Sequence, residues 1–380
     1  MANEVYIVSA VRTPIGSFGG SLSSLKAHQL GCIVISEVLK RASVNTNEVS
    51  EVILGQVNKI IYNISHYLYL LFSNLLSTGQ GQNPARQASI NAGIPITVPA
   101  HVINMLCGSG LKAVVLGYQA IKCGDSSIVI AGGQESMSNA PHVVNLRSGI
   151  KMGNTELRDT MLCDGLTDAF DNIHMGITAE NIAEKYNISR ELQDNYAFES
   201  QKRTAEAQKN GYFKDEITPV EVKIRRTTNI FDTDEYPKND TTLESLSALK
   251  PVFKSNGGVV TAGNASGIND GAAVVLLMNG EECKKRNCTP LAKIVAHAEC
   301  GVDPKIMGTG PIPAVLKTIE KAGWTMESVD IFELNEAFAA QSIAVVRDLG
   351  LNSDKVNIYG GAIALGHPIG ASGMIIFLIK

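Results

Sequence analysis

The chain is poor in the features that mark secreted, membrane-embedded or nucleic-acid-binding proteins. Only 18% of its 380 residues are charged, the net charge is -4, and a single residue is tryptophan. A balance this close to neutral provides no general attraction to nucleic acid or to an anionic membrane surface. The cysteines are odd in number and form no C-x-x-C pair or Cys/His group with zinc spacing, so we expect neither a disulfide framework nor a bound metal.

Targeting signals are also missing. The N-terminus enters the strand-like run Val5–Val8 without a basic and apolar leader, which predicts a cytoplasmic location. One apolar stretch, residues 58–77, has about the length of a membrane span, roughly 20 residues. Asn63, Ser65 and His66 interrupt it. We therefore expect no membrane attachment, and we interpret the stretch as a buried or partner-covered helix or as an inserted segment.

The hydrophobic residues that are present, 44% of the chain, are those of a compact globular protein. Their spacing predicts strands that alternate with helices, which is typical of a layered α/β fold. Strands are expected at residues 5–10, 51–57, 100–106, 126–133, 272–278, 292–298 and 329–334. Helices are expected at residues 25–41, 110–122, 178–186, 190–209, 312–322 and 337–349.

Cys107 is the most informative residue, because it lies on a glycine-rich turn between a predicted strand and a predicted helix. A cysteine becomes a good nucleophile when its pKa falls, and a helix N-terminus or a nearby imidazole has this effect. Gly108 and Gly110 leave room for an acyl group beside the backbone. An inert buried thiol is the alternative interpretation, and it suits the other cysteines better: Cys32, Cys123, Cys163, Cys283, Cys288 and Cys300.

Two further candidates lie late in the sequence. His367, between Gly366 and Pro368, is held by its turn and can act as a general base or an oxyanion donor. Asn335 begins a predicted helix, where it either holds a water against an oxyanion or is an ordinary helix cap. The small-residue loop 261–271 has no phosphate-loop pattern and either lets a flat thioester pass or is a tight connector.

The two ends of the sequence resemble each other. In each, an apolar strand-like run leads through a glycine turn into an apolar helix, at residues 102–111 and again at residues 356–374. This internal similarity suggests two related halves. The region between them, residues 137–267, is more polar and more charged, which predicts a large excursion of the chain from the core.

Together these motifs resemble the thiolase family, and within it the short-chain acetyl-CoA acetyltransferases (acetoacetyl-CoA thiolases) of the cytosol. The resemblance covers nearly the whole chain. It rests on residues 11–16, 81–87, the Cys107 turn, residues 165–170 with 174–176, the loop with Ser266, residues 335–338 and the His367 turn.

The resemblance implies an α/β fold of five layers, α-β-α-β-α, built from two similar halves. The first half is residues 1–136 and 268–288, the coenzyme A-binding loop domain is residues 137–267, and the second half is residues 289–380. It implies reversible Claisen condensation of two acetyl-CoA molecules, with coenzyme A as a substrate and no cofactor. It also implies a homotetramer built as a dimer of dimers.

The resemblance assigns the site residues as follows. Cys107 takes the acyl group as a thioester, His367 activates it, and Asn335 holds a water in the oxyanion hole. The coenzyme A and acyl contacts fall on Leu166, His174, Met175, Arg225, Phe253, Ser266, Ala337 and Phe338.

Two features depart from the family pattern. Thiolases supply a second catalytic cysteine from a Cys-x-Gly strand beyond the Gly-His-Pro histidine, and these 380 residues contain no such strand. We therefore expect a C-terminally truncated chain with impaired activity, since a catalytic acid/base commonly contributes about 10²–10⁴-fold. Residues 58–77 have no counterpart in the family and resemble an insertion, such as translated non-coding sequence.

Three alternatives remain open at this stage. A longer-chain 3-ketoacyl-CoA thiolase shares the motifs, although Met175 and residues 164–170 favour the short-chain group. A condensing enzyme of fatty-acid synthesis needs two histidines near its cysteine, whereas here His367 is paired with Asn335. A non-catalytic isoform would bind coenzyme A or partner subunits without turnover.

Overall fold

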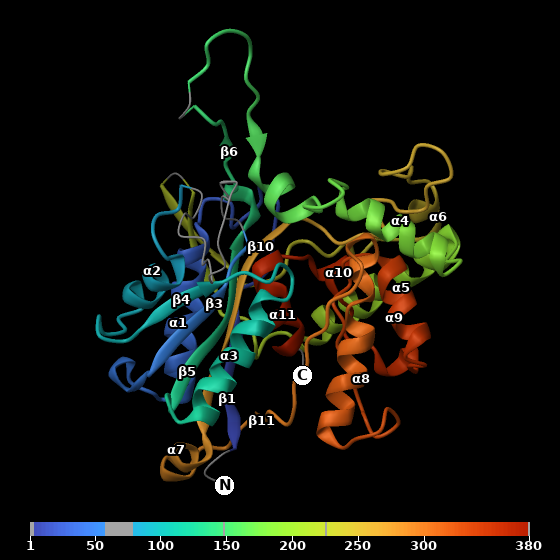
Figure 1. The fold of residues 1–380 in the computed structure, drawn as a ribbon. Coiled ribbons are helices and arrows are strands. Elements are labelled where there is room, and N and C mark those ends of the chain that lie inside the picture. The colour runs from blue at the N-terminus through green and yellow to red at the C-terminus, as the bar shows by residue number, and fades with distance from the viewer. Residues whose placement is uncertain (1–3, 58–78, 147–148, 225, 379–380) are drawn as a thin grey trace.

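The computed structural model describes residues 4–57, 79–146, 149–224 and 226–378 (Figure 1). The predicted insertion at residues 58–77 and the predicted contact residue Arg225 lie outside these ranges. The seven-stranded sheet has the order β11-β1-β10-β5-β3-β4, with β2 paired to β10. Its strands are β1 (Val5–Arg12), β2 (Gly16–Ser17), β3 (Glu51–Gly55), β4 (Ala100–Ile103), β5 (Ile128–Ser136), β10 (Asn269–Asn279) and β11 (Ala292–Lys293).

Helices cover both faces of this sheet, so its strands are apolar on both sides. In β10, Val274 and Leu276 pack with the cluster around α1 (Ala27–Ala42) and α2 (Pro84–Asn91). Val275 and Leu277 point the other way, into the cluster around α3 (Ser109–Cys123) and α11 (Ile369–Leu378). Alternate residues of a strand face opposite sides, and each fully buried aliphatic side chain contributes about 1.5–3 kcal/mol. The predicted α/β class is confirmed.

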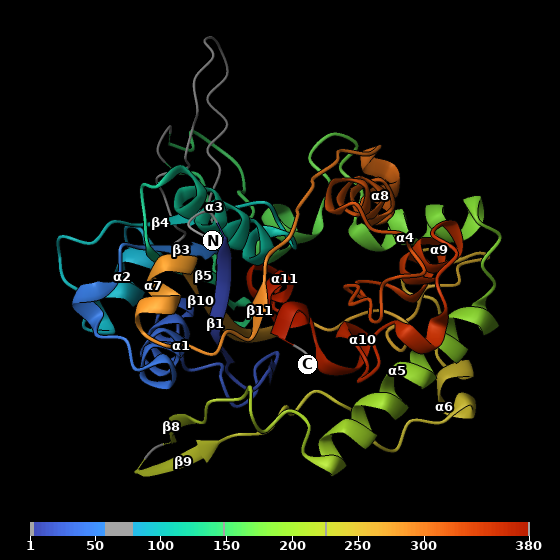
Figure 2. The same ribbon diagram turned by 90° about the horizontal axis from the view of Figure 1, so that it is seen from below.

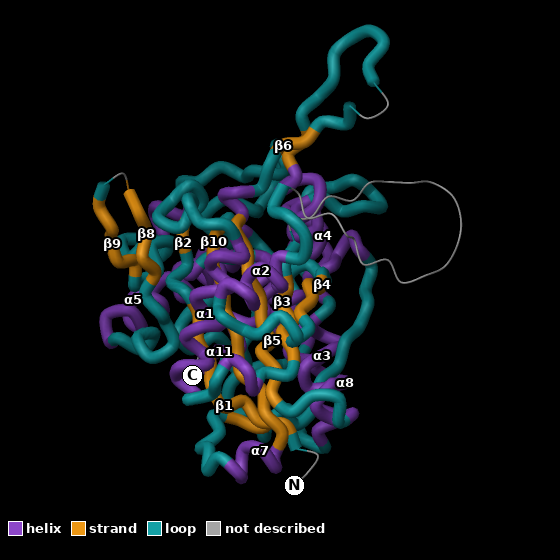
Figure 3. Tube along the Cα trace, turned by 90° about the vertical axis from the view of Figure 1, so that its left-hand side faces the viewer, coloured by secondary structure: helices purple, strands orange, loops and turns teal. Residues whose placement is uncertain are grey.

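The remaining elements lie on the far side of α11, as Figure 2 shows. They include α4 (Met175–Lys185), α5 (Arg190–Asn210), α6 (Leu243–Ser247), α8 (Pro311–Ala322), α9 (Ala339–Asp348) and α10 (Ala362–Leu365). The hairpin β8 (Val220–Ile224) and β9 (Thr227–Phe231) stands apart, and α7 (Gly280–Lys285) follows β10. The short pair β6 (His142–Val143) and β7 (Arg158–Asp159) begins a projecting arm (Figure 3).

Two strand predictions for the second half are wrong. The strand expected at residues 292–298 is reduced to β11, and residues 329–334 contribute only a single parallel bridge from Phe332 to Val356 within the described part of the chain. For residues 329–334 the physical reason is a side chain. Asn357 accepts from the Leu334 amide at 2.8 Å and donates to the Leu334 carbonyl at 2.9 Å, so it takes the place of a neighbouring strand.

The helices α3 and α11 approach each other closely because glycines line their contact. A Cβ on Gly110 would lie 3.0 Å from the Met374 amide nitrogen, and one on Gly373 would lie 3.0 Å from that of Leu111. Both helices start at the same edge of the sheet, next to the ends of β3 and β4. The residues just before the two helices, including Cys107 and His367, are therefore brought together.

Candidate active site

The Cys107 turn is fixed by its own side chains. Leu106 has a left-handed backbone, φ 48, which lets the chain reverse between β4 and α3. The Leu106 amide donates to Asn104 Oδ1 at 2.9 Å, and the Met105 amide donates to Ser109 Oγ at 2.8 Å. Cys107 is half-buried at the tip of this turn, immediately before α3.

His367 is held more tightly. It is 6% exposed, and its amide donates to Asn269 Oδ1 at 2.9 Å. Its Nδ1 lies 2.6 Å from Ser372 Oγ, and the Ser372 hydroxyl donates to the Pro368 carbonyl at 2.9 Å. Because a hydroxyl has one hydrogen to give, Ser372 Oγ accepts a hydrogen bond from Nδ1–H. Nε2 is then the free acceptor of the ring, as a general base requires.

The structure brings the three predicted catalytic residues together around Nε2. Cys107 Sγ lies 3.1 Å from His367 Nε2, and Asn335 Nδ2 lies 3.4 Å from the same nitrogen. An amide NH₂ can only donate, so the approach of Asn335 agrees with Nε2 as an acceptor. Asn335 Oδ1 is buried without a hydrogen-bond partner among the described residues, and it can hold a water.

Both reacting groups are uncharged at rest. Burial raises the pKa of Cys107 to about 11, and the charge of Glu135 acts in the same direction. Burial also lowers the pKa of His367 to about 4. A backbone amide lowers the pKa of Cys107, as expected before a helix, but the effect of burial is larger and the net shift is upward. The pair is a thiol hydrogen-bonded to a neutral imidazole, and charge separates only when sulfur attacks.

Five of the predicted substrate contacts form one apolar wall. His174 caps α4, and its ring stacks on Phe253 with centroids 4.8 Å apart. Phe253 meets Phe338 edge to face at 6.4 Å, and Met175 and Ala337 pack in the same cluster. Burial lowers the pKa of His174, so this ring is a flat neutral surface. Such a wall suits an uncharged thioester arm.

Two other predicted contacts, Ser266 and Leu166, are not part of this wall. Ser266 is tied to the segment that carries Asn335, because its amide and its hydroxyl both reach the Ala337 carbonyl at 3.0 Å. Leu166 packs in a different cluster, with Cys107 itself. Arg225 is outside the described residues.

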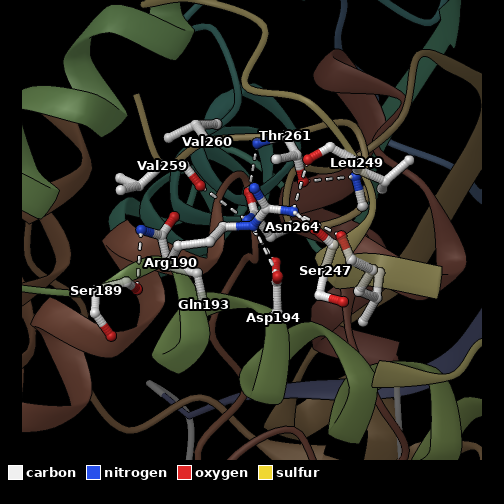
Figure 4. A network of polar contacts seen from close by, with 12 residues as sticks. Ser189, Arg190, Gln193, Asp194, Ser247, Leu249, Val259, Val260, Thr261 and Asn264 are labelled. Carbon is white, nitrogen blue, oxygen red and sulfur yellow. Dashed lines mark hydrogen bonds and ion pairs between the residues drawn. The ribbon is translucent and has the colours of Figure 1, made fainter. Parts of the chain in front are cut away.

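A buried polar network supports the loop that carries Ser266 (Figure 4). Asp194 on α5 accepts from Arg190 Nε at 2.7 Å and from Asn264 Nδ2 at 2.9 Å. Asn264 in turn accepts from the Thr261 amide at 2.8 Å. Asp194 is 5% exposed and Asn264 is fully buried, so the bond between them is protected from water. The loop is thereby held against α5.

Several supporting residues were missed by the sequence analysis, namely Ser372, Asn269 and Glu135. Ser372 follows His367 by five residues. At this spacing a side chain in the first turn of a helix can reach a residue just before the helix, so the sequence did contain a signal for this contact. Asn269 and Glu135 are distant in sequence and gave none. Within the described ranges, no group of three or more His, Cys, Asp or Glu side chains is arranged to hold a metal ion. Nor does any described helix have the length and apolarity to cross a membrane.

The chain belongs to the thiolase family. Residues 5–65 and 63–281 match the thiolase N-terminal domain, and residues 288–379 match the thiolase C-terminal domain. The fold, too, is that of a thiolase. It matches the crystal structure of the Bacillus anthracis acetyl-CoA acetyltransferase with a TM-score of 0.92 and 43% identity, over 99% of this chain and 91% of that one.

Individual relatives are similar over almost the whole chain. The cytosolic acetyl-CoA acetyltransferase of Rattus norvegicus is 54% identical over 373 residues, 98% of this chain and 89% of the rat protein. The acetyl-CoA acetyltransferase of Chromobacterium violaceum is 54% identical over 372 residues, 97% of this chain and 90% of that protein. The predicted acyltransferase class is confirmed, whereas the expected C-terminal truncation is not supported.

Proposed function

We propose that this chain is an acetyl-CoA C-acetyltransferase, which interconverts two acetyl-CoA molecules with acetoacetyl-CoA and coenzyme A through an acyl thioester on Cys107. The observation that carries the proposal is the 3.1 Å contact between Cys107 Sγ and the unprotonated His367 Nε2 within a thiolase fold. The relatives named above are acetyl-CoA acetyltransferases, which supports the short-chain substrate.

The acylation step follows from the geometry. Cys107 Sγ attacks the thioester carbonyl carbon of acetyl-CoA while its proton passes to His367 Nε2. The bond between the acyl carbon and the coenzyme A sulfur breaks, and Nε2 returns the proton to the departing thiolate. A water held by Asn335 Oδ1, together with Nε2–H, stabilises the oxyanion that forms in between. Atoms and charge balance with no cofactor.

The substrate contacts are part of the proposal. The wall of His174, Met175, Phe253, Ala337 and Phe338 takes the pantetheine arm and the acyl group, and Ser266 and Leu166 border it. Arg225 would contact the pantetheine or adenine part of coenzyme A. We also propose that the chain divides into a first half, residues 1–136 with 268–288, a coenzyme A-binding loop domain, residues 137–267, and a second half, residues 289–380.

We also propose a cytoplasmic homo-oligomer, a dimer of dimers. The arm that begins at β6 supports it, because it exposes apolar side chains that water disfavours and a second copy would cover. These are Leu146 at 56%, Ile150 at 45%, Met152 at 94% and Leu157 at 66% exposure. The cytoplasmic location is supported by the rat relative, whose name states that it is cytosolic.

One experiment tests the proposed function. The purified chain is incubated with acetyl-CoA, an acetyl adduct is sought by intact mass and peptide mapping, and thiolysis of acetoacetyl-CoA is then measured on the same sample. We expect the adduct on Cys107 followed by turnover. Cys288→Ala is the matched control, since Cys288 is a half-buried cysteine away from the site and its loss should change nothing. An adduct elsewhere, or none, contradicts the proposal.

A further inference from the structure

Glu135 is a buried carboxylate that binds two distant pieces of backbone with one oxygen. It lies near the end of β5 and is fully buried. The amide of Val57 donates to Glu135 Oε2 at 2.9 Å, and the amide of Gly370 donates to the same oxygen at 3.1 Å. An anion buried this deeply is costly, so its position in the site needs an explanation.

The first of these amides leads to the nucleophile. Val57 follows β3, and its carbonyl accepts a long hydrogen bond, 3.4 Å, from Asn104 Nδ2. The other end of that amide group, Asn104 Oδ1, holds the Leu106 amide and so shapes the Cys107 turn. Glu135 is thus connected to the Cys107 turn through the backbone of one residue, Val57, and one side chain, Asn104.

The second amide leads to the base. Gly370 is the second residue of α11 and lies between His367 and Ser372, the two residues whose contact sets the imidazole tautomer. A carboxylate is favoured at a helix N-terminus, where backbone amides are unpaired. The approach is close, because a Cβ on Gly370 would lie 2.8 Å from Glu135 Oε2.

We infer that Glu135 is a positioning residue that couples the Cys107 turn to the His367 turn, and so sets the distance over which the thiol proton moves. The inference deepens the proposed function and rests on it, since thiol acylation is the step that the distance controls. Glu135 acts through the two backbone amides, and no step of the reaction assigns it a proton.

The charge of Glu135 gives the inference an independent readout. Among the described residues, the titratable groups that act on the Cys107 thiol are His367, at 3.1 Å, and Glu135 on β5. The negative charge of Glu135 disfavours the thiolate and raises the pKa of Cys107 further than burial alone. Removing only that charge must therefore lower the pH at which the thiol ionises.

Two substitutions separate the bonds from the charge. Glu135→Gln keeps one oxygen that can accept from both amides and removes the charge, whereas Glu135→Met removes both at similar volume. Asp270→Asn is the matched control, because Asp270 is fully buried on the neighbouring strand and binds the Ser138 amide instead of either turn. Each variant is checked for folding by thermal unfolding, and two rates are measured: acetylation of Cys107 by acetyl-CoA, and alkylation by iodoacetamide across pH.

The expected results are distinct for each variant. Glu135→Gln should alkylate several-fold faster at a fixed mildly alkaline pH, with its profile shifted to lower pH, and should acetylate within a few-fold of the parent. Glu135→Met should acetylate at least about tenfold more slowly while still binding coenzyme A, since one pKa unit or 1.36 kcal/mol corresponds to tenfold. Asp270→Asn should match the parent in both rates.

The inference is overturned if Glu135→Met acetylates at the parent rate, or if Asp270→Asn loses as much. If Glu135→Met does not fold, Glu135→Gln still decides, since an unshifted alkylation profile contradicts the inference. Alkylation needs no acyl-CoA, so a shifted profile in a chain that never acetylates would refute the proposed function and leave the coupling intact.

Discussion

The two turns that meet at the active site are built in opposite ways. The Cys107 turn is open: Met105 is 43% exposed, Leu106 is 46% exposed, and the turn is held by its own Asn104 and Ser109. The His367 turn is closed, with the histidine 6% exposed and held by hydrogen bonds at its backbone and at Nδ1.

The difference reflects two tasks. A nucleophile must be reached by each substrate, so its turn faces the outside and accepts the cost of exposed apolar side chains. A general base must present one nitrogen at one angle, so it benefits from burial and from a partner on its other nitrogen. Four substitutions or conditions probe this comparison, beginning with the largest expected effect.

Removing the nucleophile should abolish the reaction. In Cys107→Ala, no acetyl adduct should form with acetyl-CoA, because Cys107 is the thiol that contacts the imidazole of His367. The thermal midpoint should hardly change, since the open turn loses one half-buried sulfur. Intact mass and a thermal scan measure both. An adduct formed at the parent rate would show that the reacting thiol lies elsewhere.

Removing the base should slow acetylation by about 10²–10⁴-fold, the usual contribution of a general base. In His367→Ala the thiol keeps its position and loses its proton acceptor. Single-turnover labelling by quenched-flow mass spectrometry gives the rate. His297→Ala is the control, because His297 lies away from the site and should leave the rate unchanged.

Acidification should slow the acetylation of Cys107 only at a pH far below neutrality. The folded pKa of His367 is lowered to about 4, so the imidazole stays a proton acceptor until the pH falls through that value, after which the rate drops about tenfold per pH unit. Single-turnover rates between about pH 5 and 8 should therefore be flat. An inflection near 6.5, the ordinary value for histidine, would show that the closed turn admits water.

Loosening the base should have the smallest effect. Ser372→Ala removes the partner of Nδ1, and a net hydrogen bond of about 0.5–1.5 kcal/mol corresponds to roughly a twofold to tenfold slower acetylation. Ser372→Thr, which keeps the hydroxyl, should restore most of the rate. Equal losses in both variants would mean that volume, rather than the tautomer, matters at this position.

The open turn was the easier one to predict from sequence. Cys107 is flanked by glycines, an apolar strand and a small-residue helix, and these local signals located both the turn and its neighbours β4, β5 and α3. His367 was found in the same way from Gly366 and Pro368. Asn269, which holds the backbone of the histidine, could not be found, because it is 98 residues away in sequence.

The electrostatics of the site and the strands of the second half were not predictable for the same reason. The thiol pKa is set by burial under Ile369, Met137 and Val57, which only the folded chain brings together. The strand expected at residues 329–334 had a suitable apolar pattern, yet the side chain of Asn357 satisfies Leu334 in its place. The apolar pattern of a segment predicts a strand, but the segment forms one only where a neighbouring strand pairs with its backbone.

The glycine contact between α3 and α11 has a consequence for how this protein can vary. A methyl group at Gly110 or Gly373 would lie 3.0 Å from the backbone of the facing helix, so a larger residue at either position would push the two helices apart even though neither residue takes part in chemistry. A substitution at either glycine is therefore expected to inactivate the protein by separating Cys107 from His367, while both reactive side chains remain in place.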